Sequence, residues 1–188
     1  MRCNIAFVAL ALAAFAPAHS DFDSAVKGQV VNNVYENAFF GLTLRLPTPP
    51  PESHISGVVN AQAERARVLE VVGTSGEMGR YTLALTIDRR SNYPTLKSVA
   101  QYTRSVRHNL EREGLQTVSA EIPLKLAGLD FVRSVLEDST TPVAHLRALQ
   151  CTELKGYLLC IDATSEDDKH LTLLLDLESK LKIAPPAK

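Results

Sequence analysis

The sequence predicts a single α+β domain, a central antiparallel β-sheet of about six strands with helices on both faces, an α/β/α sandwich. Residues 34–47 alternate apolar and polar side chains in their second half, the pattern of a half-buried strand, and Pro47 ends that strand. Residues 118–136 and 143–163 each read as two strands joined by a short glycine-containing turn. Two further segments space their apolar residues by three and four, which predicts helices.

The first twenty residues resemble a secretory signal peptide rather than part of the fold. Arg2 is a short cationic start, residues 5–15 are apolar but too short to span a bilayer, and a small-x-small motif follows. We expect cleavage near Ala18 or Ser20; a retained anchor is the alternative. No later apolar run reaches the length of a membrane span, so the processed protein is expected to be soluble, and secreted or periplasmic.

The rest of the chain has the length of one domain. We expect a flexible lead-in at 21–33, the α+β domain at 34–183 and a disordered tail at 184–188. The 188-residue sequence carries 20 Lys and Arg against 21 Asp and Glu, a net charge of -1. Without a large basic field, nucleic acid is not an expected partner.

The first half of the domain is expected to alternate between helix and strand. Residues 53–65 have the composition of a short helix, and 67–72 and 81–87 are strand candidates. The glycines at 73–79 could suggest a phosphate-binding loop, but the Lys-Ser/Thr that follows such glycines is missing. A hairpin connection is therefore expected there.

A long helix is predicted to begin at residues 91–94, where Asn92 or Ser91 can cap and Pro94 suits the first turn, and to stop at Gly114. Its buried stripe is expected to consist of Leu96, Val99, Thr103, Val106 and Leu110. A solvated face is expected for Lys97, Arg104, Arg107, His108 and Arg112. Asp88-Arg89-Arg90 is interpreted as a solvated strand end.

The second half is predicted to hold four strands and a closing helix. The strands are 118–126, 129–136, 143–154 and 157–163. Ser165 is the expected cap of the closing helix, whose first turn carries three carboxylates. Its packing residues are Leu171, Leu174, Leu175, Leu177 and Leu181.

Four segments carry a resemblance to known proteins. They are residues 34–47, 91–94, 155–159 and 165–168, which read Val-Tyr-Glu-Asn-Ala-Phe-Phe-Gly-Leu-Thr-Leu-Arg-Leu-Pro, Ser-Asn-Tyr-Pro, Lys-Gly-Tyr-Leu-Leu and Ser-Glu-Asp-Asp. Over about residues 30–183 the chain resembles a family of uncharacterised exported bacterial proteins, which in turn resemble the PsbP-like fold of a photosystem II extrinsic subunit and a Ran-binding factor.

The resemblance implies a central antiparallel sheet with helices on both faces. Members of this fold mostly bind other macromolecules, and few have known catalysis, so the resemblance implies a non-catalytic binding or assembly module. The expected partner is an extracytoplasmic protein of unknown identity. The alternative is a small extracytoplasmic enzyme, such as a hydrolase, with a dispersed active site.

Cys151 and Cys160 are candidates for a disulfide. If Lys155-Gly156 is a two-residue turn, the two thiols face each other at a non-hydrogen-bonded position, with Cα atoms about 4.5 Å apart. A bridge in an oxidising compartment would stabilise the fold by about 2 to 3 kcal/mol. A four-residue turn would instead place Cys151 opposite Leu158.

Other chemical roles have weaker support in the sequence. A Cys nucleophile with His145 or His170 as base is the functional alternative to the disulfide. Neither Cys, however, lies at the N-terminus of a predicted helix. No spacing of His, Cys, Asp or Glu matches a zinc or calcium motif. We therefore expect no metal, no cofactor and no catalytic residue that the sequence can identify.

Four aromatic residues are candidates for a partner surface, namely Tyr35, Phe39, Phe40 and Tyr93. Residues 34–47 are expected to form a first hairpin or bent strand pair, here called the opening hairpin. Exposed aromatic side chains near it and near the start of the long helix would indicate an interface. The alternative is that adjacent Phe residues at a strand bend belong to the core, as large apolar side chains commonly do.

Overall fold

The structure is a computed structural model that describes residues 21–47, 52–54, 58–75, 79–138, 145–178 and 180–184. The helices are α1 (Asp21–Ala25), α2 (Val99–Arg112) and α3 (Asp168–Glu178), with a 3₁₀ turn at Arg90–Asn92. The expected signal peptide lies outside the described residues, as do residues 185–188 of the expected tail.

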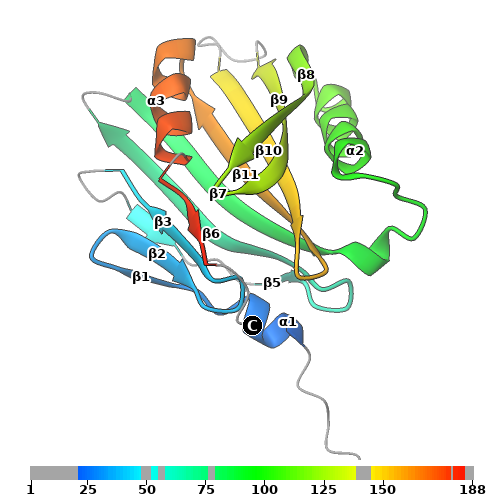
Figure 1. The fold of residues 1–188 in the computed structure, drawn as a ribbon. Coiled ribbons are helices and arrows are strands. Elements are labelled where there is room, and N and C mark those ends of the chain that lie inside the picture. Colours follow the sequence, from blue (N-terminus) through cyan, green and yellow to red (C-terminus); the bar gives the residue numbers. More distant parts are fainter. Residues whose placement is uncertain are drawn as a thin grey trace, which may run out of the picture.

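Twelve strands are described, and they form two antiparallel sheets. The small sheet contains β1 (Gln29–Val31), β2 (Val34–Asn37), β3 (Leu42–Arg45) and β12 (Lys182–Ile183). The large sheet contains β4 (Glu52–His54), β5 (Val58–Asn60), β6 (Arg65–Ser75), β7 (Gly79–Arg89), β8 (Gln116–Leu126), β9 (Leu129–Asp138), β10 (His145–Leu154) and β11 (Tyr157–Ser165). Its order is β4-β6-β7-β11-β10-β9-β8, and β5 also pairs with β6 (Figure 1).

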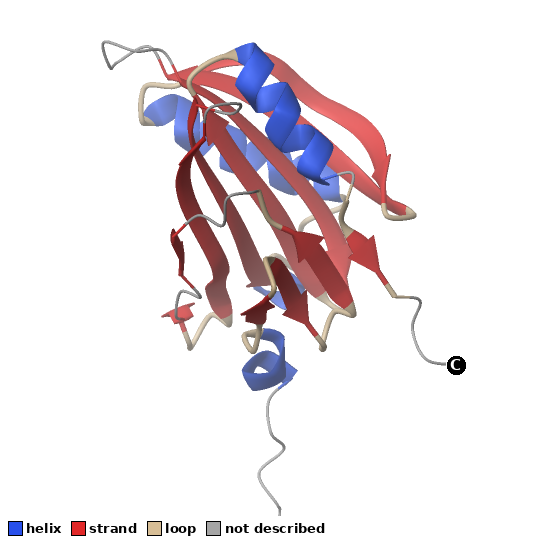
Figure 2. Ribbon diagram, turned by 90° about the vertical axis from the view of Figure 1, so that its left-hand side faces the viewer, coloured by secondary structure: helices blue, strands red, loops and turns tan. Residues whose placement is uncertain are grey.

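The expected α/β/α sandwich with a single central sheet is wrong. The described chain is mostly β-structure, with an eight-stranded sheet and a separate four-stranded sheet, and strands dominate the view in Figure 2. The long helix α2 packs on β8, β9 and β10 and covers one face of the large sheet. The other face of the large sheet packs against the small sheet and α3. Much of the layer that was expected to be helical is therefore a second sheet.

The opening hairpin explains why a second sheet forms. Its strands β2 and β3 pair as expected, with Tyr35 opposite Leu44, and the alternating Leu42 and Leu44 are buried. Instead of joining the central sheet, this hairpin pairs along its other edges with β1 and β12. Two sheets that pack face to face can bury such one-sided strands without a shared hydrogen-bond ladder.

The large sheet has an apolar layer on each face, which is clearest along β11. Tyr157, Leu159 and Ile161 belong to the main core with the small sheet and α3. The alternate residues Leu158 and Cys160 pack under α2. Period-two alternation with both faces apolar is the pattern of a strand in the middle of a sheet that is covered on both sides.

The hairpin predictions are confirmed. Ala127 and Gly128 have φ of 48° and 82°, and Lys155 and Gly156 have φ of 51° and 76°, as two-residue turns between antiparallel strands require. The second turn sets Cys151 opposite Cys160, and the two form a disulfide with Cα atoms 4.2 Å apart. A Cys nucleophile is thereby contradicted.

Three local predictions differ from the structure. Residues 53–65 form β4, β5 and a turn in the described part, not a helix. The long helix begins at Val99, because the Ser98 side chain accepts the Gln101 amide and the preceding residues are held in turns. Residues 21–33, expected as a flexible lead-in, contain α1 and β1, and the Phe22 side chain is buried.

The start of α3 also differs in detail from the expectation. Asp167, rather than Ser165, accepts the backbone amide of His170 at 2.8 Å, whereas Ser165 is buried and donates to the Asp167 carbonyl. No helix in the described ranges is long and apolar enough to cross a membrane.

Candidate binding site

A pocket of about 320 Å³ lies between α2 and the neighbouring strands β6 and β7. We call it the tyrosine pocket, and its lining residues are Arg65, Ala66, Arg67, Thr86, Ile87, Asp88, Tyr93, Tyr102, Ser105, Val106 and Asn109. Its volume falls in the range of small-ligand sites, and it combines an apolar floor with a few polar side chains.

The buried carboxylate of Asp88, 3% exposed, organises this pocket. Arg65 donates to one of its oxygens from Nε at 2.9 Å and from Nη2 at 2.6 Å. The hydroxyl of Tyr93 and, at 3.3 Å, that of Tyr102 donate to the same oxygen, and Asn92 donates to the other at 3.0 Å. A buried carboxylate needs such donors, because burial without them is costly.

The strand register brings Asp88 and Arg65 together. Arg65 begins β6 and Asp88 lies opposite it near the end of β7. The tyrosines arrive from the segment before α2 and from its first turn, and their rings pack edge to face with centroids 5.3 Å apart. Arg90 donates to the Tyr93 carbonyl at 2.6 Å, which holds this segment against the sheet.

The electrostatics of the pocket favour fixed hydrogen bonds over proton transfer. Burial, followed by the Asp88 charge, raises the pKa of the Tyr102 hydroxyl far above its ordinary value. Burial and then the hydrogen bond to Asp88 raise the pKa of Tyr93. Burial opposes ionisation of Arg65, but Asp88 outweighs it and raises the Arg65 pKa. Both tyrosines therefore stay protonated donors at neutral pH.

Among the aromatic candidates from the sequence, only Tyr93 lines this pocket. Tyr35 and Phe40 are buried, 0% and 1% exposed, and Phe39 is partly buried against the main core. The rings of Phe39 and Phe40 lie edge to face with the ring of Tyr157, 5.8 Å between centroids in each case. The aromatic residues of the opening hairpin thus join the small sheet to the large one.

Sequence reasoning missed Asp88, Arg65 and Tyr102. Asp88 was interpreted as part of a solvated strand end, which is wrong because its carboxylate is buried under the tyrosines. An acidic residue that continues an alternating strand was the available signal, but its partner Arg65 is 23 residues away and only the register identifies it.

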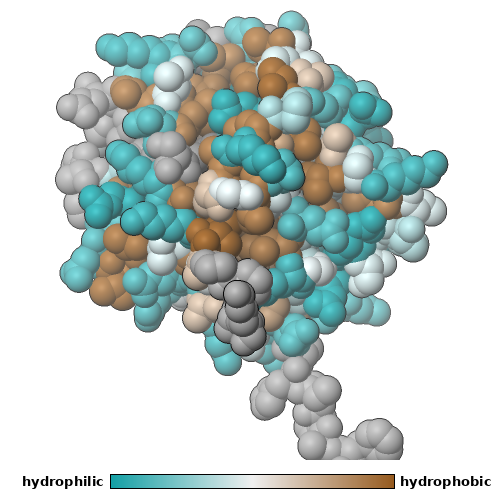
Figure 3. Space-filling view, viewed as in Figure 1, coloured by the Kyte–Doolittle hydropathy of each residue, from teal (hydrophilic) through white to brown (hydrophobic). Residues whose placement is uncertain are grey.

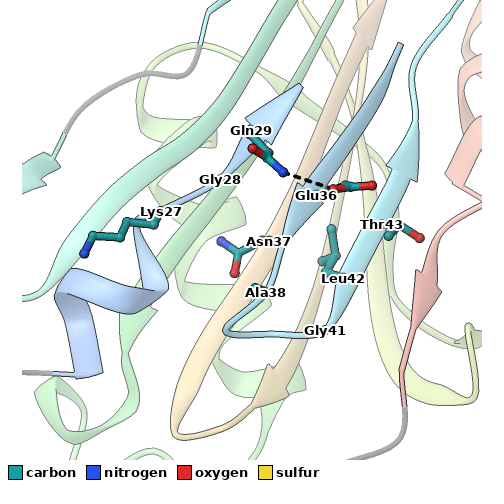
Figure 4. Close-up of a pocket in the computed structure, with 9 residues that line it drawn as sticks. All are labelled: Lys27, Gly28, Gln29, Glu36, Asn37, Ala38, Gly41, Leu42 and Thr43. Atoms are coloured by element: carbon teal, nitrogen blue, oxygen red, sulfur yellow. Dashed lines mark hydrogen bonds between the residues drawn. The ribbon is translucent and has the colours of Figure 1, made fainter. Parts of the chain in front are cut away.

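A second pocket, of about 380 Å³, lies on the small sheet and is drawn in Figure 4. Gln29 donates to Glu36 across β1 and β2 at 3.2 Å. The buried Asn37 donates to the Ala25 carbonyl at 2.9 Å and accepts the Phe40 amide at 3.2 Å. These polar groups satisfy one another and tie α1 and β1 to the hairpin of β2 and β3, so they have a structural role and leave the tyrosine pocket as the stronger candidate site.

Comparisons with known proteins do not identify a family. No protein-family model matches the chain, and no curated protein matches it. The resemblance to exported bacterial proteins with a PsbP-like fold therefore stays a prediction.

Two solved structures resemble the chain at low similarity. LpqN, described as involved in cell envelope biogenesis of Mycobacterium tuberculosis, has a TM-score of 0.49 and 15% identity over 77% of this chain and 83% of its own. PA94 of Pseudomonas aeruginosa, a protein of unknown function described as a putative regulator, has a TM-score of 0.45 and 12% identity over 78% of this chain and 92% of its own. Both scores are below 0.5, so neither protein's role is transferred to this chain.

Proposed function

We propose that this protein is an exported, non-catalytic binding module that holds an extracytoplasmic partner in the tyrosine pocket. The observation that carries the proposal is the organisation of this pocket around one buried carboxylate, which holds Arg65, Tyr93 and Tyr102 in fixed positions. Binding sites gain affinity when their side chains are held in place before the partner arrives.

A binding role fits the chemistry of the pocket better than catalysis. The Asp88 carboxylate accepts donors from four side chains, and the raised pKa values keep the tyrosine hydroxyls protonated. A general base needs an available lone pair and a pKa near the working pH. The pocket instead presents two aromatic rings and the half-exposed guanidinium of Arg65, the side chains that are enriched where proteins bind partners.

Two observations support export. The sequence begins with the pattern of a signal peptide, and the structure contains the Cys151–Cys160 disulfide. Disulfides form and persist in oxidising compartments and are rare in the cytosol. A periplasmic or secreted location is therefore part of the proposal.

Site-directed cross-linking tests this function. A photoreactive phenylalanine analogue at Asn109, an exposed position that lines the pocket, in protein expressed with its own leader, is expected to cross-link one partner reproducibly in the exported fraction. Ser105→Trp, which fills the pocket from an exposed position on α2, is expected to abolish that cross-link. Thr172→Trp on α3 is the matched control, an exposed helical position away from the pocket.

The proposal is contradicted if Ser105→Trp and Thr172→Trp give the same cross-linked product, because the partner would then bind elsewhere. It is also contradicted if the protein is recovered only from the cytosol.

A further inference from the structure

A third pocket lies on the opposite face of the large sheet from the tyrosine pocket. Its volume is about 430 Å³, and its lining includes Phe40, Leu129, Leu154, Lys155 and Ile183. It opens where β12 approaches the turns that join β8 to β9 and β10 to β11. Figure 3 shows apolar side chains gathered over the middle of this face, with polar side chains among them.

The apolar lining continues from this pocket along β8 and β9. Leu126, Leu124 and Leu129 are only partly buried against the main core, and Phe131 follows Leu129 on the same face. Ile122, the next residue of this row on β8, is 48% exposed. Phe131 is buried, 1% exposed, but the other four side chains, Ile122, Leu124, Leu126 and Leu129, are not fully buried and form an apolar strip that water reaches.

Arg133 stands at the end of that strip and differs from comparable arginines. Four other buried or half-buried arginines in the described residues pair with a carboxylate, namely Arg89, Arg90, Arg107 and Arg147. Arg133 is half-buried as well, but no carboxylate within the described ranges pairs with it. Its Nε and Nη2 donate only to the amide oxygen of Gln150, at 2.9 and 2.7 Å.

Gln150 adds a second unused donor at the same place. It lies opposite Arg133 on β10 and is fully buried, 0% exposed. Its Nε2 has no hydrogen-bond partner among the described residues. A buried amide without a partner costs about 1 to 3 kcal/mol, and a cation without a counter-charge adds to that cost. Together, Arg133 and Gln150 form a donor pair that an incoming carboxylate would satisfy.

We propose that this face binds a free fatty acid, with its carboxylate at Arg133 and Gln150 and its alkyl chain along the strip into the 430 Å³ pocket. Arg133 and Leu129 are four residues apart on β9, which corresponds to about 13 Å and to an alkyl chain of about ten carbons. This site is independent of the proposed function, because the tyrosine pocket lies on the other face of the sheet.

The charge and the shape together select this ligand. A neutral apolar chain would leave the Arg133 charge uncompensated, and a small carboxylate alone would leave the strip exposed to water. An anionic membrane surface is attracted by clusters of basic residues, whereas Arg133 is a single half-buried cation at the far end of an apolar strip that leads to a concave pocket.

The test is a titration of the exported protein with dodecanoate below its micelle concentration, followed by NMR of the Gln150 side-chain amide. Saturable one-to-one binding that shifts this amide is expected. Arg133→Gln is expected to weaken binding at least about tenfold, the loss typical of a hydrogen bond to a charged group. Arg80→Gln, a change at an exposed arginine on β7, is the matched control and should bind as tightly as the wild type.

Further ligands and one variant separate the alternatives. Ile183→Trp, which fills the pocket without touching the donor pair, is expected to weaken dodecanoate binding but to leave Arg133 in place. Equal affinity for dodecanol would overturn the proposal, because the charge would then be irrelevant. Equal affinity for acetate, binding only to anionic vesicles, or unchanged binding in Arg133→Gln would overturn it as well.

Discussion

The two faces of the large sheet differ in how fully their buried polar groups are hydrogen-bonded. Under α2, Asp88 accepts four side-chain donors, and Arg107 contacts two carboxylates. On the face toward the small sheet, the only hydrogen bonds of the Arg133 side chain within the described ranges go to the amide oxygen of Gln150, whose nitrogen has no partner there. One sheet therefore combines a satisfied polar network with an unsatisfied one.

This difference distinguishes polar groups that stabilise the fold from polar groups that are available to a ligand. A satisfied network stabilises the folded chain and changes little when a ligand binds, whereas unsatisfied buried donors weaken the fold and gain most from a ligand. Proteins commonly give up stability at such sites in exchange for function. Variants on the two faces should therefore respond in opposite directions.

The largest effect is expected from removing the Asp88 carboxylate. Asp88→Ala leaves the donors of Arg65, Asn92 and the two tyrosines without their acceptor, and should lower the free energy of unfolding by about 3 kcal/mol. Urea denaturation of the variant and the wild type at pH 7 measures this loss of unfolding free energy. Asp88→Asn keeps the size and one acceptor and should lose less; equal losses for both variants would contradict a hydrogen-bonded role.

The disulfide is the next test, because it lies under α2 and not on the Arg133 face. The pair Cys151→Ala and Cys160→Ala should lower the free energy of unfolding by about 2.5 kcal/mol, the loop-closure contribution expected for so short a loop. The double variant is compared with the wild type by urea denaturation. Dodecanoate affinity should remain unchanged, and a large loss of it would show that the two faces are coupled.

Arg107 and Arg133 provide the direct comparison. Arg107→Met leaves Glu121, 13% exposed in its side chain, with only the longer contact to Arg104 at 3.3 Å, and should cost about 2 kcal/mol of unfolding free energy. The double variant Arg133→Met, Gln150→Leu removes the cation together with its buried amide acceptor and should be neutral or stabilising by up to about 1 kcal/mol. Thermal unfolding of both proteins checks the direction of each change in stability. A loss in the double variant as large as that in Arg107→Met would remove the distinction between the faces.

The smallest effect concerns pH. Hydrogen bonds from Thr117, then from His108 and Arg107, lower the pKa of Glu111 from 4.5 to about 2. Because the folded-state pKa lies below the unfolded value, the contribution of Glu111 to stability is present above about pH 4.5 and is lost as the pH falls toward 2. A carboxyl ¹³C titration of Glu111 measures this pKa. Thr117→Val should move it back toward 4.5, and an unchanged midpoint would contradict the assigned cause.

The sequence by itself determined the local features of this protein. The alternation at Leu42 and Leu44, the glycine-containing turns at 127–128 and 155–156, and the resulting pairing of Cys151 with Cys160 all follow from the covalent chain. These features depend on residues that are close in sequence, where side-chain period and turn geometry leave few alternatives.

The tertiary structure alone decided how distant segments meet. The opening hairpin could have joined the central sheet, but its pairing with β12, nearly 140 residues further along the chain, created a second sheet. Asp88 became the centre of a pocket because β6 placed Arg65 opposite it. In the described part of the chain Arg133 has no carboxylate partner for the same reason, since the strand order set Gln150 beside it. The free energy of burying a charge depends on its neighbours in space, and strand register, not local composition, selects those neighbours.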